Sequence, residues 1–178
     1  MITGHVFIAA SLDGFIARSD GDIGWLLERD DPSEDHGYAA FIQDIDAILM
    51  GRGSYETVRD MPEWPYTRPV LVLSQTLRDR DAPAALAGKV RFTDMSPEQA
   101  MRMLEAEGRR RVYVDGGRIV QSFLRAGLIA DMTITHVPVL IGTGRSLFGA
   151  VPSDIPLIHE ATRSFPSGLV QSRYRIAP

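Results

Sequence analysis

The chain has 178 residues, a length for which one domain around a single sizeable core is expected. Apolar residues make up 44% of it and charged residues 24%, which is the balance of a globular protein and excludes the disordered and fibrous classes. A net charge of −4 without a basic stripe argues against a nucleic-acid partner, and the absence of cysteine excludes disulfide frameworks, thiolate nucleophiles and cysteine-based zinc sites.

The first residues show no basic segment ahead of an apolar run, so we expect no secretory leader. No apolar run approaches the roughly 18 residues that a membrane span needs, so we expect no membrane partner. The cytoplasm is the expected location.

Strands and helices are expected to alternate through the first half of the chain. Apolar runs that are bounded by turn residues predict buried strands. They lie at residues 6–10, 47–50, 70–73 and 90–92. A short helix is predicted at 38–44. Residues 20–37 are rich in Gly, Asp, Ser and Pro around the apolar Trp25, which predicts a long functional loop.

The second half contains two well-marked helices. Ser96 is a candidate N-cap and Gln99 completes a capping box, so a helix is expected to follow and to end at Gly108. After a glycine pair, an apolar stripe predicts an amphipathic helix that ends at Gly127. Further strands are expected at 111–114 and 131–136, within 155–161 and within 169–176.

This order of elements predicts an α/β fold in one domain spanning residues 1–178. Because strands alternate with helices first and then follow one another directly, the central sheet should be mainly parallel with an antiparallel C-terminal edge. In open α/β sheets, ligands bind beyond the carboxyl ends of the strands. The loops that begin at Gly51, Ser74 and Gly116 therefore carry the functional hypotheses.

The first of these loops contains Gly51, Arg52, Gly53 and Ser54, between a strand and a helix. Free backbone N–H groups and the positive end of the helix dipole could hold a phosphate there, with a charge-assisted contact from Arg52. Taken alone, the pattern also fits a tight turn with a solvated arginine.

The other two loops offer similar chemistry. The glycines of Asp115-Gly116-Gly117-Arg118 let a backbone approach a pyrophosphate without a clash from a Cβ atom, although a purely structural turn is the alternative. The hydroxyl and amide groups of Ser74 and Gln75 suit an adenosine ribose or its 2′-phosphate, although a plain β-turn fits equally well.

Familiar cofactor and metal signatures are missing. The sequence contains no G-x-G-x-x-G, no Walker pattern and no H-x-x-x-H pair, and its four histidines lack the spacing of ligands. We therefore expect no metal site and no Rossmann fingerprint.

Several motifs together resemble a known family. Ile-Leu-Met-Gly-Arg-Gly-Ser-Tyr-Glu at 48–56 resembles the strand-to-helix signature of dihydrofolate reductases, and Ser74 and the Gly116-Gly117 pair follow in that family's order. Ser-Leu-Asp-Gly-Phe-Ile-Ala at 11–17, Asp-Ile-Gly-Trp at 22–25 and the Gly-Thr-Gly-Arg-Ser-Leu-Phe stretch that ends at Phe148 are more similar to proteins related to the C-terminal reductase domain of riboflavin-pathway deaminase/reductases.

The resemblance implies a three-layer α/β/α fold of the dihydrofolate reductase type, with NADPH laid across the ends of the strands. By matching motif, Ala10 would contact the nicotinamide amide. The rest of the cofactor would be held by Gly51, Arg52, Gly53, Ser54, Leu73, Ser74, Gln75, Gly116, Gly117, Arg118, Ile119 and Val120. Because Gln75 stands where many relatives have arginine, the choice of NADPH over NADH stays open.

The resemblance also implies a candidate proton donor. Asp35 falls about where dihydrofolate reductases place their active-site carboxylate, with Glu34 as the alternative match and a solvated first-turn acid as the structural alternative. Asp13 is a second acid near the predicted site, where a turn role is equally consistent with its Asp-Gly context.

Two further residues are expected at the substrate. Trp25 would lie on the mobile loop over the nicotinamide and the substrate. Arg68 lies six residues before Ser74, as the folate-carboxylate arginine of dihydrofolate reductases does, and would clamp an anion. A surface arginine is the structural alternative.

The leading hypothesis is an NADPH-dependent reductase of a small heterocyclic or carbonyl compound. Phe15 stands where riboflavin-pathway pyrimidine reductases carry a basic residue, and their Ala-Asp-Asp-Pro motif is missing, which argues against a ribosyl-phosphate substrate. A true dihydrofolate reductase is the alternative within the enzyme class, and a non-catalytic dinucleotide-binding module is the alternative outside it. Because relatives of this kind often pair through their sheet edges, the resemblance also implies a homodimer.

Overall fold

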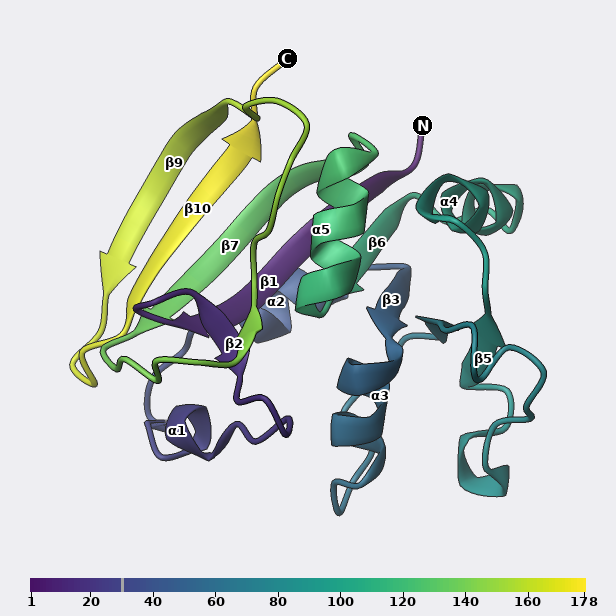
Figure 1. The fold of residues 1–178 in the computed structure, drawn as a ribbon, viewed down its shortest axis with the longest axis horizontal. Coiled ribbons are helices and arrows are strands. Elements are labelled where there is room, and N and C mark those ends of the chain that lie inside the picture. Colours follow the sequence, from purple (N-terminus) through teal and green to yellow (C-terminus); the bar gives the residue numbers. More distant parts are fainter. Residues whose placement is uncertain (30) are drawn as a thin grey trace.

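The computed structural model describes residues 1–29 and 31–178 and shows a mixed α/β fold (Figure 1). Its main sheet has eight strands in the order β5-β4-β3-β6-β1-β7-β10-β9. All pairs from β5 to β7 are parallel, whereas β10 is antiparallel to β7 and to β9. The predicted parallel sheet with an antiparallel C-terminal edge is confirmed.

The strands of the main sheet are β1 (Thr3–Ser11), β3 (Ala47–Gly51), β4 (Val70–Leu73), β5 (Val90–Thr93), β6 (Arg111–Asp115), β7 (Ile129–Val137), β9 (Leu157–Ser164) and β10 (Val170–Ile176). The helices are α1 (Gly24–Leu27), α2 (Tyr38–Gln43), α3 (Arg52–Arg59), α4 (Pro97–Ala106) and α5 (Gly117–Arg125), and Ala84–Leu86 forms a 3-10 turn. A small second sheet pairs β2 (Phe15–Ala17) with β8 (Arg145–Ser146).

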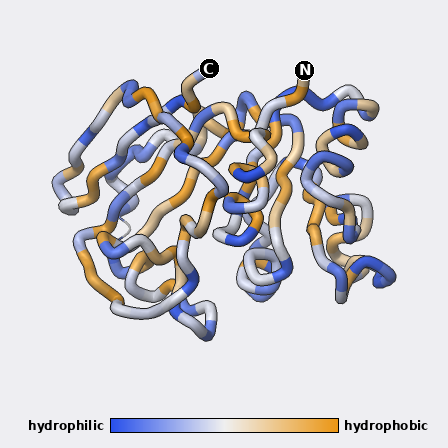
Figure 2. Tube along the Cα trace, turned by 45° about the horizontal axis from the view of Figure 1, so that its top comes forward, coloured by the Kyte–Doolittle hydropathy of each residue, from blue (hydrophilic) through white to orange (hydrophobic). Residues whose placement is uncertain are grey.

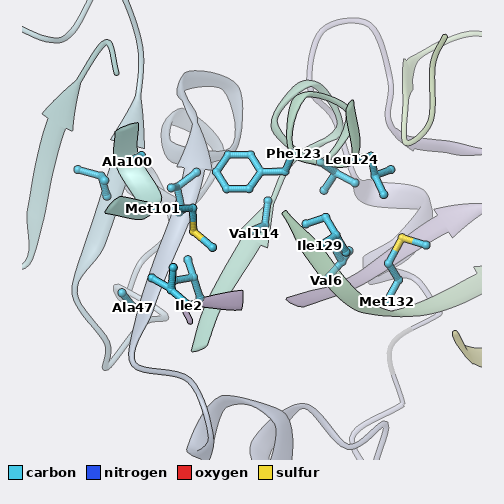
Figure 3. Packing of buried hydrophobic residues seen from close by; sticks show 14 of the residues in the cluster. Ile2, Val6, Ala47, Ala100, Met101, Val114, Phe123, Leu124, Ile129 and Met132 are labelled. Carbon is cyan, nitrogen blue, oxygen red and sulfur yellow. The ribbon is translucent and has the colours of Figure 1, made fainter. Parts of the chain in front are cut away.

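Apolar clusters on both faces of the main sheet produce the three layers. Helices α4 and α5 cover one face, where Met101 and Phe123 are almost fully buried against Val114 of β6 (Figure 3). Helices α2 and α3 cover the other face, where Tyr55 and Val58 pack on β3 and β4. Burial of this apolar area is the main force that holds helices on a sheet. Figure 2 shows hydrophobic stretches along the inner strands and hydrophilic ones on the outer turns.

Local signals explain where α4 and α5 begin and end. The Ser96 hydroxyl accepts from the Gln99 N–H and the Gln99 side chain accepts from the Ser96 N–H, so the predicted capping box is present. Helix α5 begins after Gly116, whose φ of +90° suits glycine, and is followed by Gly127 with a φ of +66°.

The sequence did not predict α1, β2 or β8. Residues 20–37 were expected to form one long loop, but four of them form α1. Strands β2 and β8 have three and two residues, too few for an alternating apolar pattern to appear, and they pair across a long sequence separation. Both short elements flank the carboxyl edge of the main sheet, so they matter for the site.

Candidate functional site

The carboxyl ends of β6, β3 and β4 lie level with one another. Met50 of β3 pairs with Asp115 of β6, and Gly51 pairs with Leu73 of β4. The loops predicted to bind the cofactor therefore open at one edge of the sheet, where α3 begins (Figure 1). Level carboxyl ends of parallel strands are the usual place of a ligand in α/β sheets.

The start of α3 is joined to the end of β4. Arg52 donates from Nη1 to the Thr76 hydroxyl at 3.2 Å, and the Ser74 and Thr76 hydroxyl groups lie 3.2 Å apart. Arg52 also forms an exposed ion pair with Glu56 at 3.6 Å. The structure thus brings Arg52 and Ser74 together, with Gln75 exposed beside them. A guanidinium among hydroxyl groups is a suitable environment for a phosphate.

Asp115 ends β6 and is partly buried beneath this edge. The Ser54 hydroxyl and the Gly116 N–H are close enough to lower the pKa of its carboxyl group. Burial nevertheless raises the pKa of the Asp115 carboxyl above its ordinary value, because these neighbours oppose the effect only in part. Perturbed acids of this kind are characteristic of functional sites.

The Tyr113 hydroxyl lies between the Phe7 carbonyl oxygen and the Asp115 carboxyl group. The Tyr113 hydroxyl has one proton, and its bond to the Phe7 carbonyl oxygen at 2.8 Å is shorter than its 3.3 Å contact with Oδ1 of Asp115. The hydroxyl therefore donates mainly to Phe7, and its contact with Asp115 opposes the effect of burial on the Asp115 pKa only in part.

Two further phenols surround the carboxyl group. Burial, helped by the charge of Asp115, raises the pKa of Tyr38 to about 12, and the same causes raise the pKa of Tyr66 above its ordinary value. Both phenols therefore stay protonated at neutral pH. Within the described part of the chain, neither hydroxyl forms a hydrogen bond with another residue, so both can donate to a ligand.

The glycine pair at the start of α5 has a packing role. A Cβ atom on Gly117 would overlap the backbone carbonyl oxygen of Ser146 in β8, and one on Gly116 would meet the Ser54 hydroxyl. The sequence suggested that these glycines let a pyrophosphate approach, and in the structure the backbone of β8 occupies the open side of Gly117. Arg118 is exposed on the first turn of α5, whereas Val120 faces the core and Ile119 packs against Gly51.

The Asp13 carboxylate connects two loops through hydrogen bonds. Its carboxylate accepts from the Ser11 hydroxyl and from the N–H groups of Ile141 and Gly142, at 2.8 Å for the last of these. The hydrogen bond from Ser11 in particular holds the pKa of Asp13 below its ordinary value. An ionised acid with three donors fixes the turn after β1 to the loop before β8.

Asp35 lies in the turn ahead of α2. Asp35 is exposed and its carboxylate accepts from the Gly37 N–H at 2.8 Å, just ahead of α2. Its neighbour Glu34 is held by the Ser167 hydroxyl and N–H, and the hydroxyl contact lowers the pKa of Glu34. Within the described residues, both carboxylates are thus bonded in the turns ahead of α2 and after β9.

Arg68 and Trp25 are also used structurally. The Arg68 guanidinium donates to the carbonyl oxygens of Ile42 and Gln43 at the end of α2, where a cation complements the helix dipole. Trp25 lies in α1 with 6% of its surface exposed, in a cluster with Val137 and Phe165. Its Nε1 atom is buried without a partner among the described residues.

Ala10, the expected nicotinamide contact, lies at the end of β1 and is 1% exposed. Because its side chain is buried, a ligand could reach only its backbone and the adjoining turn. Two residues outside the predicted set also face this edge. They are Asp115, which the sequence presented only as part of a glycine turn, and Arg145 of β8.

Two negative findings apply to the described residues. They contain no group of three or more His, Cys, Asp or Glu that could hold a metal ion. None of their helices is long and apolar enough to cross a membrane.

Comparison with known proteins places the chain in a family. A family model described as the RibD C-terminal domain matches residues 3–170. The chain belongs to this family. An uncharacterized protein of Bacillus subtilis, YwjB, is 30% identical over 162 residues, which cover 90% of each chain. The predicted relationship to riboflavin-pathway reductase domains is therefore confirmed.

Solved structures of the family and of dihydrofolate reductase share the fold. A protein from Shewanella sp. PV-4, provisionally assigned to riboflavin biosynthesis, is 34% identical and covers 99% of this chain and 100% of its own, with a TM-score of 0.91. A dihydrofolate reductase from Enterococcus faecalis, complexed with NADP(H), is 15% identical and covers 99% of this chain and 97% of its own, with a TM-score of 0.64. The dihydrofolate reductase-like fold of this RibD C-terminal domain protein is confirmed.

The packing of Gly117 against β8 leads to a prediction about stability. Gly117→Ala should lower the free energy of unfolding by about 1–3 kcal/mol without any ligand, because the Ser146 carbonyl must move. Gly24→Ala is the matched control, since a Cβ there would lie 3.3 Å from the exposed and adjustable Asp22 carboxylate. Urea unfolding measures both. Equal stability of the two variants would contradict the packing role of Gly117.

Proposed function

We propose that this RibD C-terminal domain protein is a reductase that uses a nicotinamide dinucleotide, NADPH in preference to NADH, to reduce a small heterocyclic or carbonyl compound. The observation that carries the proposal is the position of Asp115. A protonatable acid, two phenols with free hydroxyl groups and the phosphate-suited Arg52 and Ser74 face the same edge of the sheet. Reduction of a C=N or C=O bond needs both a hydride and a proton, and such an edge can serve both.

The residues present fit the dinucleotide. Arg52, Ser74 and Thr76 would hold the adenosine phosphate, and the N–H groups at the starts of α3 and α5 would face the pyrophosphate. The backbone of Ala10 would contact the nicotinamide amide. When bound, the cofactor supplies the hydride.

Asp115 would supply the proton. Burial raises the pKa of its carboxyl group and so favours the protonated form that a proton donor needs, and Tyr113 contacts Oδ1 of the same carboxyl group at 3.3 Å. The hydroxyl groups of Tyr38 and Tyr66 would donate hydrogen bonds to the substrate, and the aromatic rings around them would exclude water. This assigns the acid to Asp115 in place of the sequence-based candidate Asp35, whose carboxylate is exposed.

The proposed reductase is more consistent with a small substrate than with dihydrofolate. In dihydrofolate reductases the arginine that corresponds to Arg68 in the sequence binds the folate carboxylate, but here the Arg68 guanidinium is bonded to α2 carbonyl groups. A folate tail would have to displace those bonds.

A variant pair tests the role of Asp115. Purified protein and NADPH are mixed with one acceptor at a time: dihydropterin, dihydrofolate or an aromatic aldehyde. Oxidation of NADPH is followed in each reaction. Asp115→Asn should lower kcat by about 10²–10⁴-fold, as loss of a general acid does, while Asp35→Asn should leave it nearly unchanged. Because the protonated acid is the active form, wild-type kcat should fall as the pH rises through the raised pKa of Asp115.

NADPH affinity serves as the control, since Asn keeps the shape of Asp115 and should leave the dissociation constant nearly unchanged. A fully active Asp115→Asn variant would contradict the role of Asp115 as the proton donor. A kcat that falls only in Asp35→Asn would assign that role to Asp35. Bound NADPH without oxidation by any acceptor would favour the non-catalytic module.

We also propose a homodimer that pairs through the β9 edge of the sheet. Every residue of β9 is exposed, including Leu157 at 43% and Ile158 at 38%, and an open edge strand with exposed apolar side chains favours pairing with another strand. Light scattering should show a dimer, and Ile158→Lys should shift it toward the monomer. A monomer at every concentration tested would overturn this proposal.

A further inference from the structure

A cleft opens at the amino ends of β3 and β4, opposite the edge proposed for the dinucleotide (Figure 1). Its volume of about 230 Å³ is below the roughly 300–1,000 Å³ of pockets that enclose drug-sized ligands, so it suits a smaller molecule. The residues that define its chemistry are Leu71, Gly88, Arg91, Leu104, Glu107 and Arg109.

The end of α4 fixes the position of Arg109 at this cleft. Gly108 follows the helix with a φ of +84°, and its N–H donates to the Glu105 carbonyl oxygen. The Arg109 N–H donates to the Leu104 carbonyl oxygen at 3.0 Å. These are the two hydrogen bonds of a Schellman motif, which glycine favours. The backbone of Arg109 is therefore held against the turn of α4 that also supplies Leu104 to the cleft.

Arg91 and Glu107 neutralise each other at the side of the cleft. Arg91 pairs with Leu71 in the sheet, and Leu71 packs in the cluster that α4 covers, so both side chains leave the sheet toward α4. The Arg91 guanidinium donates to both carboxylate oxygens of Glu107, at 2.7 and 2.9 Å. These bonds hold the pKa of Glu107 below its ordinary value, so the pair is fully charged at neutral pH.

Arg109 has no such partner. Its Nε atom is buried without a hydrogen-bond acceptor, and among the residues that the structure describes no carboxylate forms an ion pair with Arg109. The nearby Asp46 carboxylate instead accepts from the N–H groups of Arg110 and Arg111, at 2.8 and 3.0 Å. Two arginines and one glutamate line the cleft, so one positive charge is left over. An unpaired buried donor is uncommon in proteins and indicates a place for an acceptor.

The surroundings of Arg109 favour one kind of anion. A guanidinium matches a carboxylate through parallel N–H donors. A second negative charge, as on a phosphate dianion, would meet the Glu107 carboxylate in the same cleft and be repelled. Leu71 and Leu104 bound the cleft with apolar side chains, which favours an apolar body behind the charge. A Cβ atom on Gly88 would meet no atom within 4 Å, so this side of the cleft is open.

We propose that this cleft is a second binding site, which takes a small monocarboxylate with an apolar chain or ring. The carboxylate accepts hydrogen bonds from Arg109, and the apolar part lies against Leu71 and Leu104. The site is separate from the carboxyl edge of the sheet. The inference therefore holds whether or not the protein binds a dinucleotide.

Benzoate is the probe that tests this site, with the backbone amide signals of the protein in NMR spectra as the readout. Benzoate should shift the signals of Gly88 and Arg109 and leave those of Gly51 and Gly116, at the cofactor edge, unchanged. Benzamide has the same shape without the charge and should bind at least about tenfold more weakly. Inorganic phosphate should cause no saturable shift at Arg109.

A pair of variants tests the role of Arg109. Arg109→Gln should weaken benzoate at least about tenfold, as loss of a charge-assisted contact does. Arg110→Gln is the matched control, because Arg110 is exposed and donates to Glu105 at 3.3 Å, and it should leave the affinity nearly unchanged. Thermal unfolding verifies that each variant is folded. If Arg109→Gln does not fold, the comparison of benzoate with benzamide on the wild-type protein decides the question.

Four outcomes would overturn the inference. Unshifted signals at Gly88 and Arg109, or shifts confined to Gly51 and Gly116, would exclude the cleft as the site. Equal binding of benzamide would exclude a charged contact. Equal shifts with phosphate would show a non-selective attraction of anions. Unchanged benzoate affinity in a folded Arg109→Gln variant would exclude Arg109 as the anion ligand.

Discussion

The parallel register of β6, β3 and β4 is the constraint on which the rest of the site depends. The pairs Met50 with Asp115 and Gly51 with Leu73 bring three strand ends level, so that the loops after them open on one edge. A slip by one residue would turn every side chain to the other face of the sheet, and Asp115 would leave the tyrosines for the α5 side. Burial on both faces prevents that slip, because Val112 and Val114 are fully buried on the α5 side while Tyr113 packs against the α2 side.

Much of this fold was predictable from sequence, because long elements carry their signals locally. The capping box at Ser96 and the apolar stripe of α5 are such signals, and both helices are present. The joining of Arg52 and Ser74 was also predictable, since each follows a buried strand of one parallel sheet. The short strands β2 and β8 were not, because their pairing depends on contacts between distant parts of the chain.

The chemistry of single residues was harder to predict for the same reason. Asp115 stands next to a glycine pair in the sequence, but the phenols that surround it come from Tyr38 in α2 and from Tyr66 in the segment before β4. Asp35 has the expected place in the chain order, yet the turn ahead of α2 directs its carboxylate to the Gly37 N–H. In both cases, tertiary packing decides which acid is buried, and burial decides which acid keeps its proton.

A crystal structure of the protein grown with NADPH tests the central claim most directly. The account predicts that the dinucleotide crosses the carboxyl ends of β4, β3, β6 and β1, with its nicotinamide beside Ala10 and the Asp115 carboxyl group. Density for the dinucleotide at another surface, such as the cleft near Arg109 at the opposite ends of the strands, would contradict it. A nicotinamide bound at the predicted edge but remote from Asp115 would contradict the assignment of the acid.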